Sequence, residues 1–167
     1  SSVGALMATY IAQEILRQTR TLVEGITPRC DFGEDKKYRN WGKAVGAIED
    51  TNTQGFFRVF QVRYGDTFRW SPTDGITSQA MYIPTVMVLV TYPLKYNELD
   101  ALQDTVALDR EDIIETITDP TNYPSADDGV VYAVNAEIVP AWIETGRGDA
   151  NAVLSLGFEY FYRKELS

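Results

Sequence analysis

Four acidic residues lie close together in the second half of the chain, where carboxylates could do chemistry. They are Asp109, Glu111, Asp112 and Glu115. Paired carboxylates serve glycosidases as acid, base or nucleophile, and clustered carboxylates can bind cations. The same residues open a predicted helical segment, where negative charge interacts favourably with the helix dipole. We interpret them as helix-start residues, and a hydrolase that uses Asp109 or Glu111 is one alternative hypothesis.

Nucleophilic catalysis has no support in the residue types. The chain contains no histidine, and Cys30 is its only cysteine. A nucleophilic cysteine needs a nearby base, usually histidine, and histidine is also the commonest zinc ligand. The triplet within Gly146-Arg-Gly-Asp149 occurs in integrin ligands, but these residues also suit a hairpin loop, which we favour. We therefore expect a protein that is not an enzyme, with no catalytic residues, no cofactor and no metal.

Aromatic residues alternate with arginines in Phe57-Arg58 and in Phe68-Arg69-Trp70. A sheet face of this kind could stack RNA bases. It could equally contact a protein, because arginine and aromatic residues are enriched at interfaces. The formal net charge is −9, which opposes phosphate binding. The charge favours a protein interface or a strand with solvent-facing arginines, and an RNA- or protein-binding module remains the alternative function.

Length and composition indicate one globular domain over residues 1–167. The hydrophobic fraction of 44% and the charged fraction of 23% are ordinary for such a domain. The N-terminal stretch lacks the layout of a signal peptide. The most apolar run, residues 83–94, is too short to cross a bilayer as a helix. We expect a soluble protein with no membrane partner.

Two regions have helical periodicity. Apolar residues between positions 3 and 26 recur at spacings of four and seven, with an N-terminal serine as a cap and Gly25 as a stop. Residues 97–119 form the second region, which is broken near Asp109. Asp109 can cap a new segment, so this region predicts a helix pair.

Five segments have the apolar content or the alternation typical of strands. They are residues 44–48, 56–64, 81–92, 130–142 and 152–164. Gly65-Asp66 is interpreted as a turn that opens a long loop over residues 65–80. The order of elements predicts an α+β fold: an antiparallel (mixed) sheet of about four to five strands, with an N-terminal helix and a central helix pair packed on one face.

The predicted core joins one strand face to one helix face. The strand residues are Leu154, Leu156 and Phe158. The helix residues are Met7, Ile11 and Ile15. Apolar residues at these periods mark the buried side of each element, so we expect the two sets to pack together.

Four stretches in this order resemble a known family. An amphipathic N-terminal helix precedes the alternating strand 56–64 and a second strand that ends in Val86-Met-Val-Leu-Val-Thr-Tyr92. A helix follows that ends in Asp112-Ile-Ile-Glu-Thr-Ile-Thr-Asp-Pro120, and the last strand reads Leu154-Ser-Leu-Gly-Phe-Glu-Tyr-Phe-Tyr-Arg163. Over almost its whole length the chain resembles the tail terminator (tail-completion) proteins of long-tailed bacteriophages, through pattern and order.

The resemblance implies a structural virion protein of the tail or neck, assembled in the host cytoplasm. Such proteins form a hexameric ring that caps the tail tube protein, ends tube polymerisation and joins the tail to a head-side connector or stopper protein. In contractile tails a related protein also contacts the sheath. DNA crosses the ring only as passing cargo, and an acidic lumen would let it slide. The family has no catalytic residues to carry over.

Arginine and aromatic residues are the predicted interface residues, because these types anchor protein contacts. They are Arg58, Arg63, Phe68, Arg69, Trp70 and Arg163. Three of them fall in the predicted loop over residues 65–80. We expect that loop to contact a neighbouring subunit or another partner.

Overall fold

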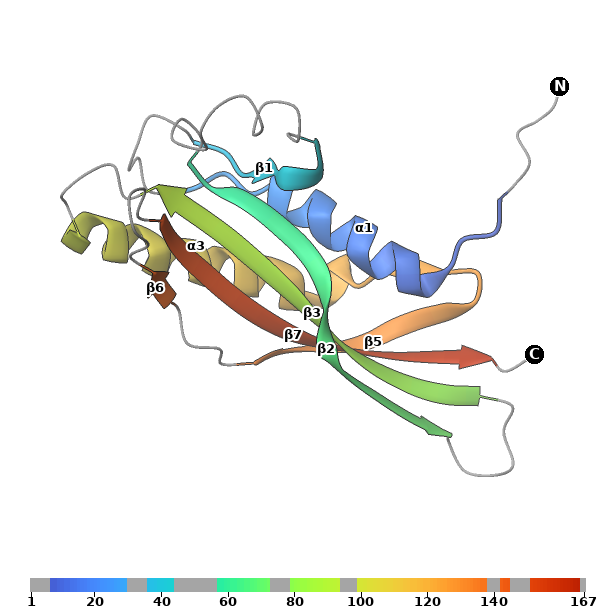
Figure 1. Cartoon of the computed structure of the whole chain (residues 1–167). Coiled ribbons are helices and arrows are strands. Elements are labelled where there is room, and N and C mark those ends of the chain that lie inside the picture. The colour runs from blue at the N-terminus through green and yellow to red at the C-terminus, as the bar shows by residue number, and fades with distance from the viewer. Residues whose placement is uncertain are drawn as a thin grey trace, which may run out of the picture.

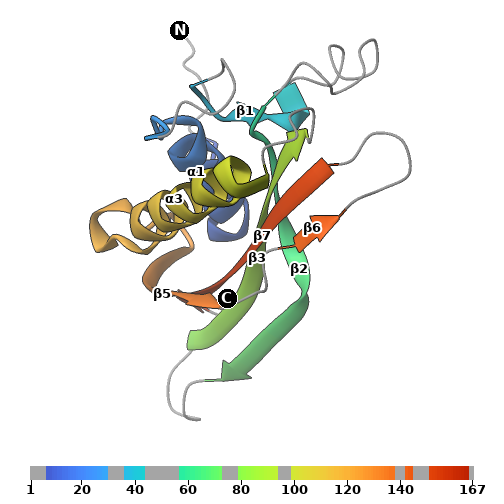
Figure 2. The ribbon, with the colours of Figure 1, turned by 90° about the vertical axis from the view of Figure 1, so that its left-hand side faces the viewer.

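In the part of the chain that the structure describes, one curled sheet carries two α-helices on a single face (Figures 1 and 2). The computed structural model describes residues 7–29, 36–43, 57–72, 79–93, 99–137, 142–144 and 151–165. The α+β class predicted from the sequence is confirmed. Neither of these helices is long and apolar enough to cross a membrane.

Helix α1 spans Ile11–Glu24 and buries one face against the sheet. Its buried residues recur at every fourth position: Ile11, Ile15, Thr19 and Val23. The Thr19 hydroxyl is hydrogen bonded to the hydroxyl of Tyr160 at 2.6 Å, which joins the helix to the last strand. Gly25 ends the helix as predicted, and its N–H donates to the carbonyl oxygen of Thr21 at 3.1 Å.

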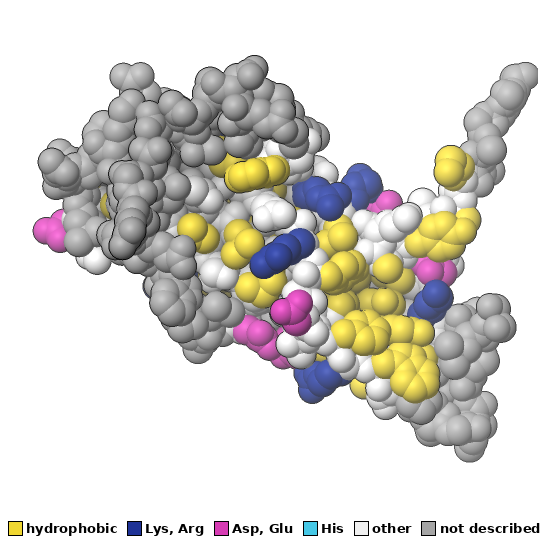
Figure 3. Space-filling view, viewed as in Figure 1, with side chains coloured by type: hydrophobic (Ala, Val, Ile, Leu, Met, Phe, Trp, Pro, Cys, Tyr) yellow, Lys and Arg dark blue, Asp and Glu magenta, His cyan; other side chains and the backbone are white. Residues whose placement is uncertain are grey.

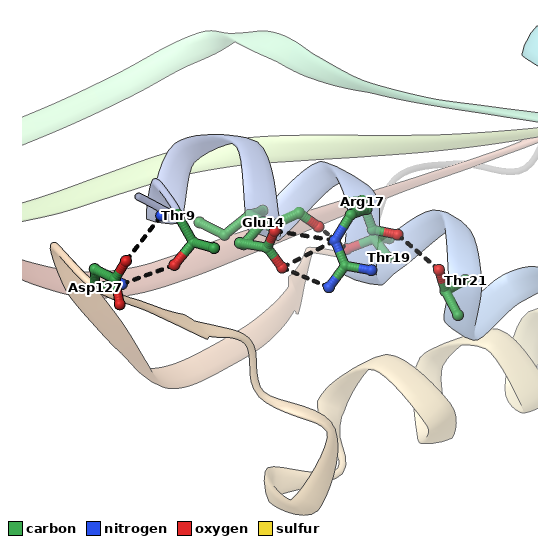
Figure 4. Close-up of polar contacts among 7 residues, drawn as sticks. Thr9, Glu14, Arg17, Thr19, Thr21 and Asp127 are labelled. Atoms are coloured by element: carbon green, nitrogen blue, oxygen red, sulfur yellow. Dashed lines mark hydrogen bonds and ion pairs between the residues drawn. The ribbon is translucent and has the colours of Figure 1, made fainter. Parts of the chain in front are cut away.

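The helix begins later than its periodicity predicts. The serine expected as its cap lies outside the described residues, and residues 7–10 are not helical. The N–H of Ile11 donates to the Asp128 carboxylate at 2.7 Å, and the N–H of Thr9 donates to Asp127 at 2.9 Å. Figure 4 shows Asp127 beside Thr9. Carboxylates from a distant turn therefore satisfy amides at the helix start.

Helix α3 runs without a break over Leu99–Thr118, so the predicted helix pair is wrong. Asp109, the expected cap of the second helix, lies in the middle of α3 and is completely buried. Its carboxylate accepts hydrogen bonds from Arg58 and Tyr92. Asp109 does not cap a helix, because the helix continues on both sides of it and its carboxylate binds these two side chains. The short 3₁₀ helix η3 (Pro120–Asn122) follows.

The sheet has the strand order β1-β2-β3-β7-β5-β4, with β6 paired to β7 outside this path. The strands are β1 Arg39–Asn40, β2 Val59–Pro72, β3 Gln79–Pro93, β4 Ser125–Ala126, β5 Gly129–Glu137, β6 Trp142–Glu144 and β7 Asn151–Glu165. All pairs are antiparallel except β1 with β2. Within the described residues the sheet thus holds seven strands, more than the predicted four to five, because β1, β4 and β6 are too short to show an alternating pattern.

The predicted loop over residues 65–80 is largely a β-hairpin. Strand β2 continues to Pro72 and β3 begins at Gln79, while residues 73–78 lie outside the described part. The predicted turn at Gly65-Asp66 is an irregularity inside β2, where the register with β3 shifts between Tyr64 and Phe68. Such a bulge bends a strand without ending it. In Figure 2 this hairpin extends well beyond the layer of helices.

The core prediction is confirmed except for one residue. Leu154, Leu156 and Phe158 are buried, and they belong to one core cluster with Ile11 and Ile15. Met7, by contrast, is 84% exposed. It lies before the first turn of α1, so the helical period does not apply to it. The predicted strand at residues 44–48 falls outside the described residues.

Candidate interaction surface

Arg58 is not at an interface, because its side chain is completely buried within the chain. Its Nε lies 2.7 Å from Oδ2 of Asp109, which is also completely buried. Its guanidinium lies 5.0 Å from the centre of the Phe57 ring and 5.9 Å from that of Tyr38. Arginine also packs against aromatic rings inside a folded chain, so the sequence pattern does not distinguish a buried arginine from an interface arginine.

The buried pair ties the start of β2 to the middle of α3 and the end of β3. The Tyr92 hydroxyl donates to Oδ2 of Asp109 at 2.7 Å. Burial, and then the charge of Asp109, raises the pKa of Tyr92 well above its ordinary value, so this hydroxyl stays a donor. The φ of Arg58 is 59°, a strained value for a non-glycine residue. We interpret this cluster as structural, since strain of this kind persists only where surrounding contacts impose it.

The four acidic residues of the opening hypothesis do not converge. Asp109 faces the core, whereas Glu111 and Asp112 both bind Arg29 at 2.9 Å. Glu115 is exposed. The described residues hold no group of three or more potential metal ligands of the histidine, cysteine or acidic types. A hydrolase that uses Asp109 would need that side chain to reach solvent, which its buried position does not allow.

The other five predicted residues are accessible. Phe68 and Trp70 are 56% and 50% exposed, and both pack against Tyr82, with ring centres 5.8 and 6.4 Å apart. Arg69 forms an ion pair with Glu159, and Arg63 is exposed. The exposed side chain of Arg163 lies 5.0 Å from the centre of the Tyr132 ring. Their contact with a partner stays a prediction.

The strand register places the ends of β2, β3, β7 and β5 side by side. Pro72 pairs with Ala80, Ala80 with Lys164, and Lys164 with Gly129, so four long strands meet at one end of the sheet. The start of α1 is held at the same end by Asp127 and Asp128. A side chain on Gly129 would not fit there, because its Cβ would lie 2.7 Å from a backbone oxygen.

Exposed apolar side chains gather at this end, which we call the apolar end. Of the seven large hydrophobic residues exposed in the described part of the chain, six lie here: Met7, Tyr10, Phe68, Trp70, Val130 and Tyr132. The seventh, Trp41, lies in the 3₁₀ helix η1 (Trp41–Lys43). Figure 3 shows hydrophobic side chains gathered toward the β2–β3 hairpin. Phe68 and Trp70 contact Tyr82, whereas Tyr132 contacts Phe161 and Met81. Large exposed apolar side chains that lie at one end of a protein point to a contact site there.

Two of these six residues, Phe68 and Trp70, are among the interface residues predicted from the sequence, because an arginine lies between them. The helical periodicity predicts Met7 in the core. Tyr10, Val130 and Tyr132 are not among the predicted interface residues. Val130 and Tyr132 alternate along β5 with the buried Val131, and that alternation was the available signal.

The sequence was also compared with known proteins. Neither the models of protein families nor the curated proteins give a match to this chain.

Proposed function

We propose that the protein is a structural protein of a phage virion, which forms a ring that caps the tail tube and joins the tail to the head connector. The observation that supports this proposal is the apolar end, where six large hydrophobic side chains are exposed on several elements. Surface of this extent is unfavourable in water and is stabilised when a partner covers it. The described residues hold no group of three or more histidine, cysteine, aspartate or glutamate side chains that could bind a metal ion.

A closed ring suits a protein that must end a polymer. One heterologous contact, repeated around an axis, uses up every copy of both contact surfaces and leaves none for growth. Stacking on the tube then depends on the faces of the ring. The tube protein, the connector and, in a contractile tail, the sheath are the proposed partners. The net charge of −9 would keep DNA from adhering as it passes.

The first test uses phage particles that lack this protein. We expect tails of uncontrolled length, or tails that do not join heads, to accumulate in electron micrographs. Adding the purified chain should restore joining, since a terminator acts after the tube has formed. A matched addition of the chain with Trp41→Ser should restore joining equally well. Normal virions without the protein would rule out the proposal.

A second prediction concerns the double variant Arg69→Ala, Trp70→Ala. The side chain of Arg69 is 58% exposed and Trp70 is 50% exposed. An exposed ion pair contributes at most about 1 kcal/mol to stability. We expect the free energy of unfolding to change by about 1 kcal/mol or less. The protein concentration needed for ring assembly should rise at least tenfold. Native mass spectrometry measures assembly and urea denaturation measures stability. A variant that assembles normally but unfolds readily would place this segment in the core.

The alternative function is an RNA- or protein-binding module. The exposed rings of Phe68 and Trp70 could stack bases, but Arg69 beside them is already paired with Glu159. RNA binding that weakens steeply with salt and is lost in Trp70→Ala would favour this alternative.

A further inference from the structure

A groove of about 460 Å³ lies between α1 and the edge of the sheet. Helix α1 lines it with Arg20 and Glu24, and strand β2 lines it with Gln61 and Val62. Figures 1 and 2 show β1 next to the later turns of α1, and Asn40 at the end of β1 also lines the groove. The volume falls within the usual range of ligand sites.

The groove follows a strand edge that β1 leaves open. Strand β1 pairs with β2 only at Val59 and Phe60. The N–H of Arg39 donates to the carbonyl oxygen of Arg58 at 3.0 Å, so in this parallel register Phe60 directs its N–H and C=O groups toward β1. Two residues further on, Val62 directs its own groups to the same edge, where no described strand pairs with it. An edge of this kind is a template for another strand.

Arg20 adds a positive charge to the groove. It is partly buried, yet among the described residues it forms no ion pair and no hydrogen bond. Arg17, one turn earlier in α1, is instead paired with Glu14. A guanidinium that is partly withdrawn from water is stabilised by a carboxylate, which it binds through two parallel hydrogen bonds. The groove therefore combines an open strand edge with a site for one acidic group.

We propose that this groove binds an extended peptide of another protein, which pairs with β2 beyond β1 and places one carboxylate on Arg20. Extended peptides bind many proteins by adding a strand to an open sheet edge. Because side chains alternate between the two faces of a strand, one acidic residue can face α1 while its two neighbours point to the other face. The inference does not rest on the proposed function, since it needs neither a ring nor a tail.

The charges around the groove favour a peptide over a nucleic acid. Glu24 lines the same wall as Arg20, and the formal net charge of the chain is −9. A nucleic acid carries a negative charge on every phosphate, so these charges oppose its binding. A peptide can carry a single carboxylate, and its backbone has the donors and acceptors that match those of Val62.

Fluorescence anisotropy with a short peptide tests the proposal. The probe is Thr-Val-Glu-Val-Thr, with fluorescein at its N-terminus and an amide at its C-terminus, and its partner probe has glutamine in place of glutamate. Two further probes carry N-methyl groups on alternate residues, one on the valines and one on the other residues. Only one of these two sets of N–H groups can face β2, so only one of the two methylated probes should lose its strand pairing.

The protein variants separate recognition by Arg20 from the general effect of charge. Arg20→Gln removes the proposed partner of the carboxylate. Arg63→Gln is the matched control, because Arg63 is an exposed arginine of β2 on the opposite face from Val62. Circular dichroism confirms that both variants are folded.

We expect the glutamate probe to bind the wild type and Arg63→Gln equally, and to bind Arg20→Gln about tenfold more weakly. The glutamine probe should bind all three chains with that weaker affinity, and one methylated probe should fail to bind. The proposal is overturned if the glutamate probe binds no chain, if Arg20→Gln and Arg63→Gln weaken it equally, or if both methylated probes bind as well as the parent.

Two further measurements identify a different occupant. A fluorescein-labelled oligouridylate that binds the wild type more tightly than the glutamate probe would overturn the proposal in favour of RNA. Sedimentation equilibrium of the chain alone that shows dimers, lost in Arg20→Gln, would overturn it in favour of a second copy.

Discussion

Replacing Asp109 by alanine is expected to lower the free energy of unfolding by about 3–5 kcal/mol, the cost of removing one partner from a buried ion pair. The carboxylate accepts hydrogen bonds from both Arg58 and Tyr92 at 2.7 Å. Without it, a completely buried guanidinium and a buried hydroxyl lose their charged acceptor. Urea denaturation followed by circular dichroism measures the change.

The same helix offers a matched control. Glu111→Ala removes a carboxylate whose side chain is 56% exposed and paired with Arg29, so it should cost about 1 kcal/mol or less. The triple variant Arg58→Met, Tyr92→Phe, Asp109→Leu should recover much of the lost stability, because it removes the hydroxyl that donates to Asp109 together with the buried pair, and hydrophobic replacements of a buried pair are often neutral. An Asp109→Ala chain as stable as Glu111→Ala would show that the ion pair does not support the fold.

Phe158→Ala is expected to cost about 3–5 kcal/mol, as other fully buried phenylalanines do. Phe158 is completely buried in β7, where it pairs with Val86 on one side and Ala136 on the other. Truncation would leave a cavity at the centre of the sheet that its neighbours cannot fill. Thermal and urea unfolding both measure the loss.

Phe161→Ala is the control from the same strand. Phe161 is three residues further along, on the opposite face, and is only partly buried, so its loss should cost roughly 1 kcal/mol. Equal losses for the two variants would mean that the helix-covered face does not hold the main core.

The candidate surface could be predicted only in part from the sequence. The residue types of Phe68, Arg69, Trp70 and Arg163 identified side chains that the structure leaves exposed. Arg58 is also an arginine with an aromatic neighbour, as Arg69 is, yet Arg58 is buried. Its environment depends on Asp109, 51 residues away, and a local pattern contains no information about so distant a partner.

Met7 and Tyr10 are the opposite case, because they are exposed although the local pattern suits a buried helix face. Their apolar character suits a helix face, but the helix begins only at Ile11. The N–H of Ile11 donates to the carboxylate of Asp128, which lies 117 positions further along the chain. The register of β2, β3, β7 and β5 brings the exposed residues of β2 and β5 to one end of the sheet, and Asp127 and Asp128 hold Met7 and Tyr10 at the same end. That register is a property of strand pairing across the whole chain.

The sequence by itself determined the α+β class, the buried face of α1 and the buried face of β7. These follow from periods of 3.6 and 2 residues, which are set by the local backbone geometry and need no distant partner. Only the tertiary structure decided where α1 starts, that α3 is unbroken and that β2 continues through its bulge. In each case the deciding contact joins residues that are far apart in the chain. Whether a helix is capped or broken, and whether a strand turns, therefore depends on a residue that comes close only when the chain folds.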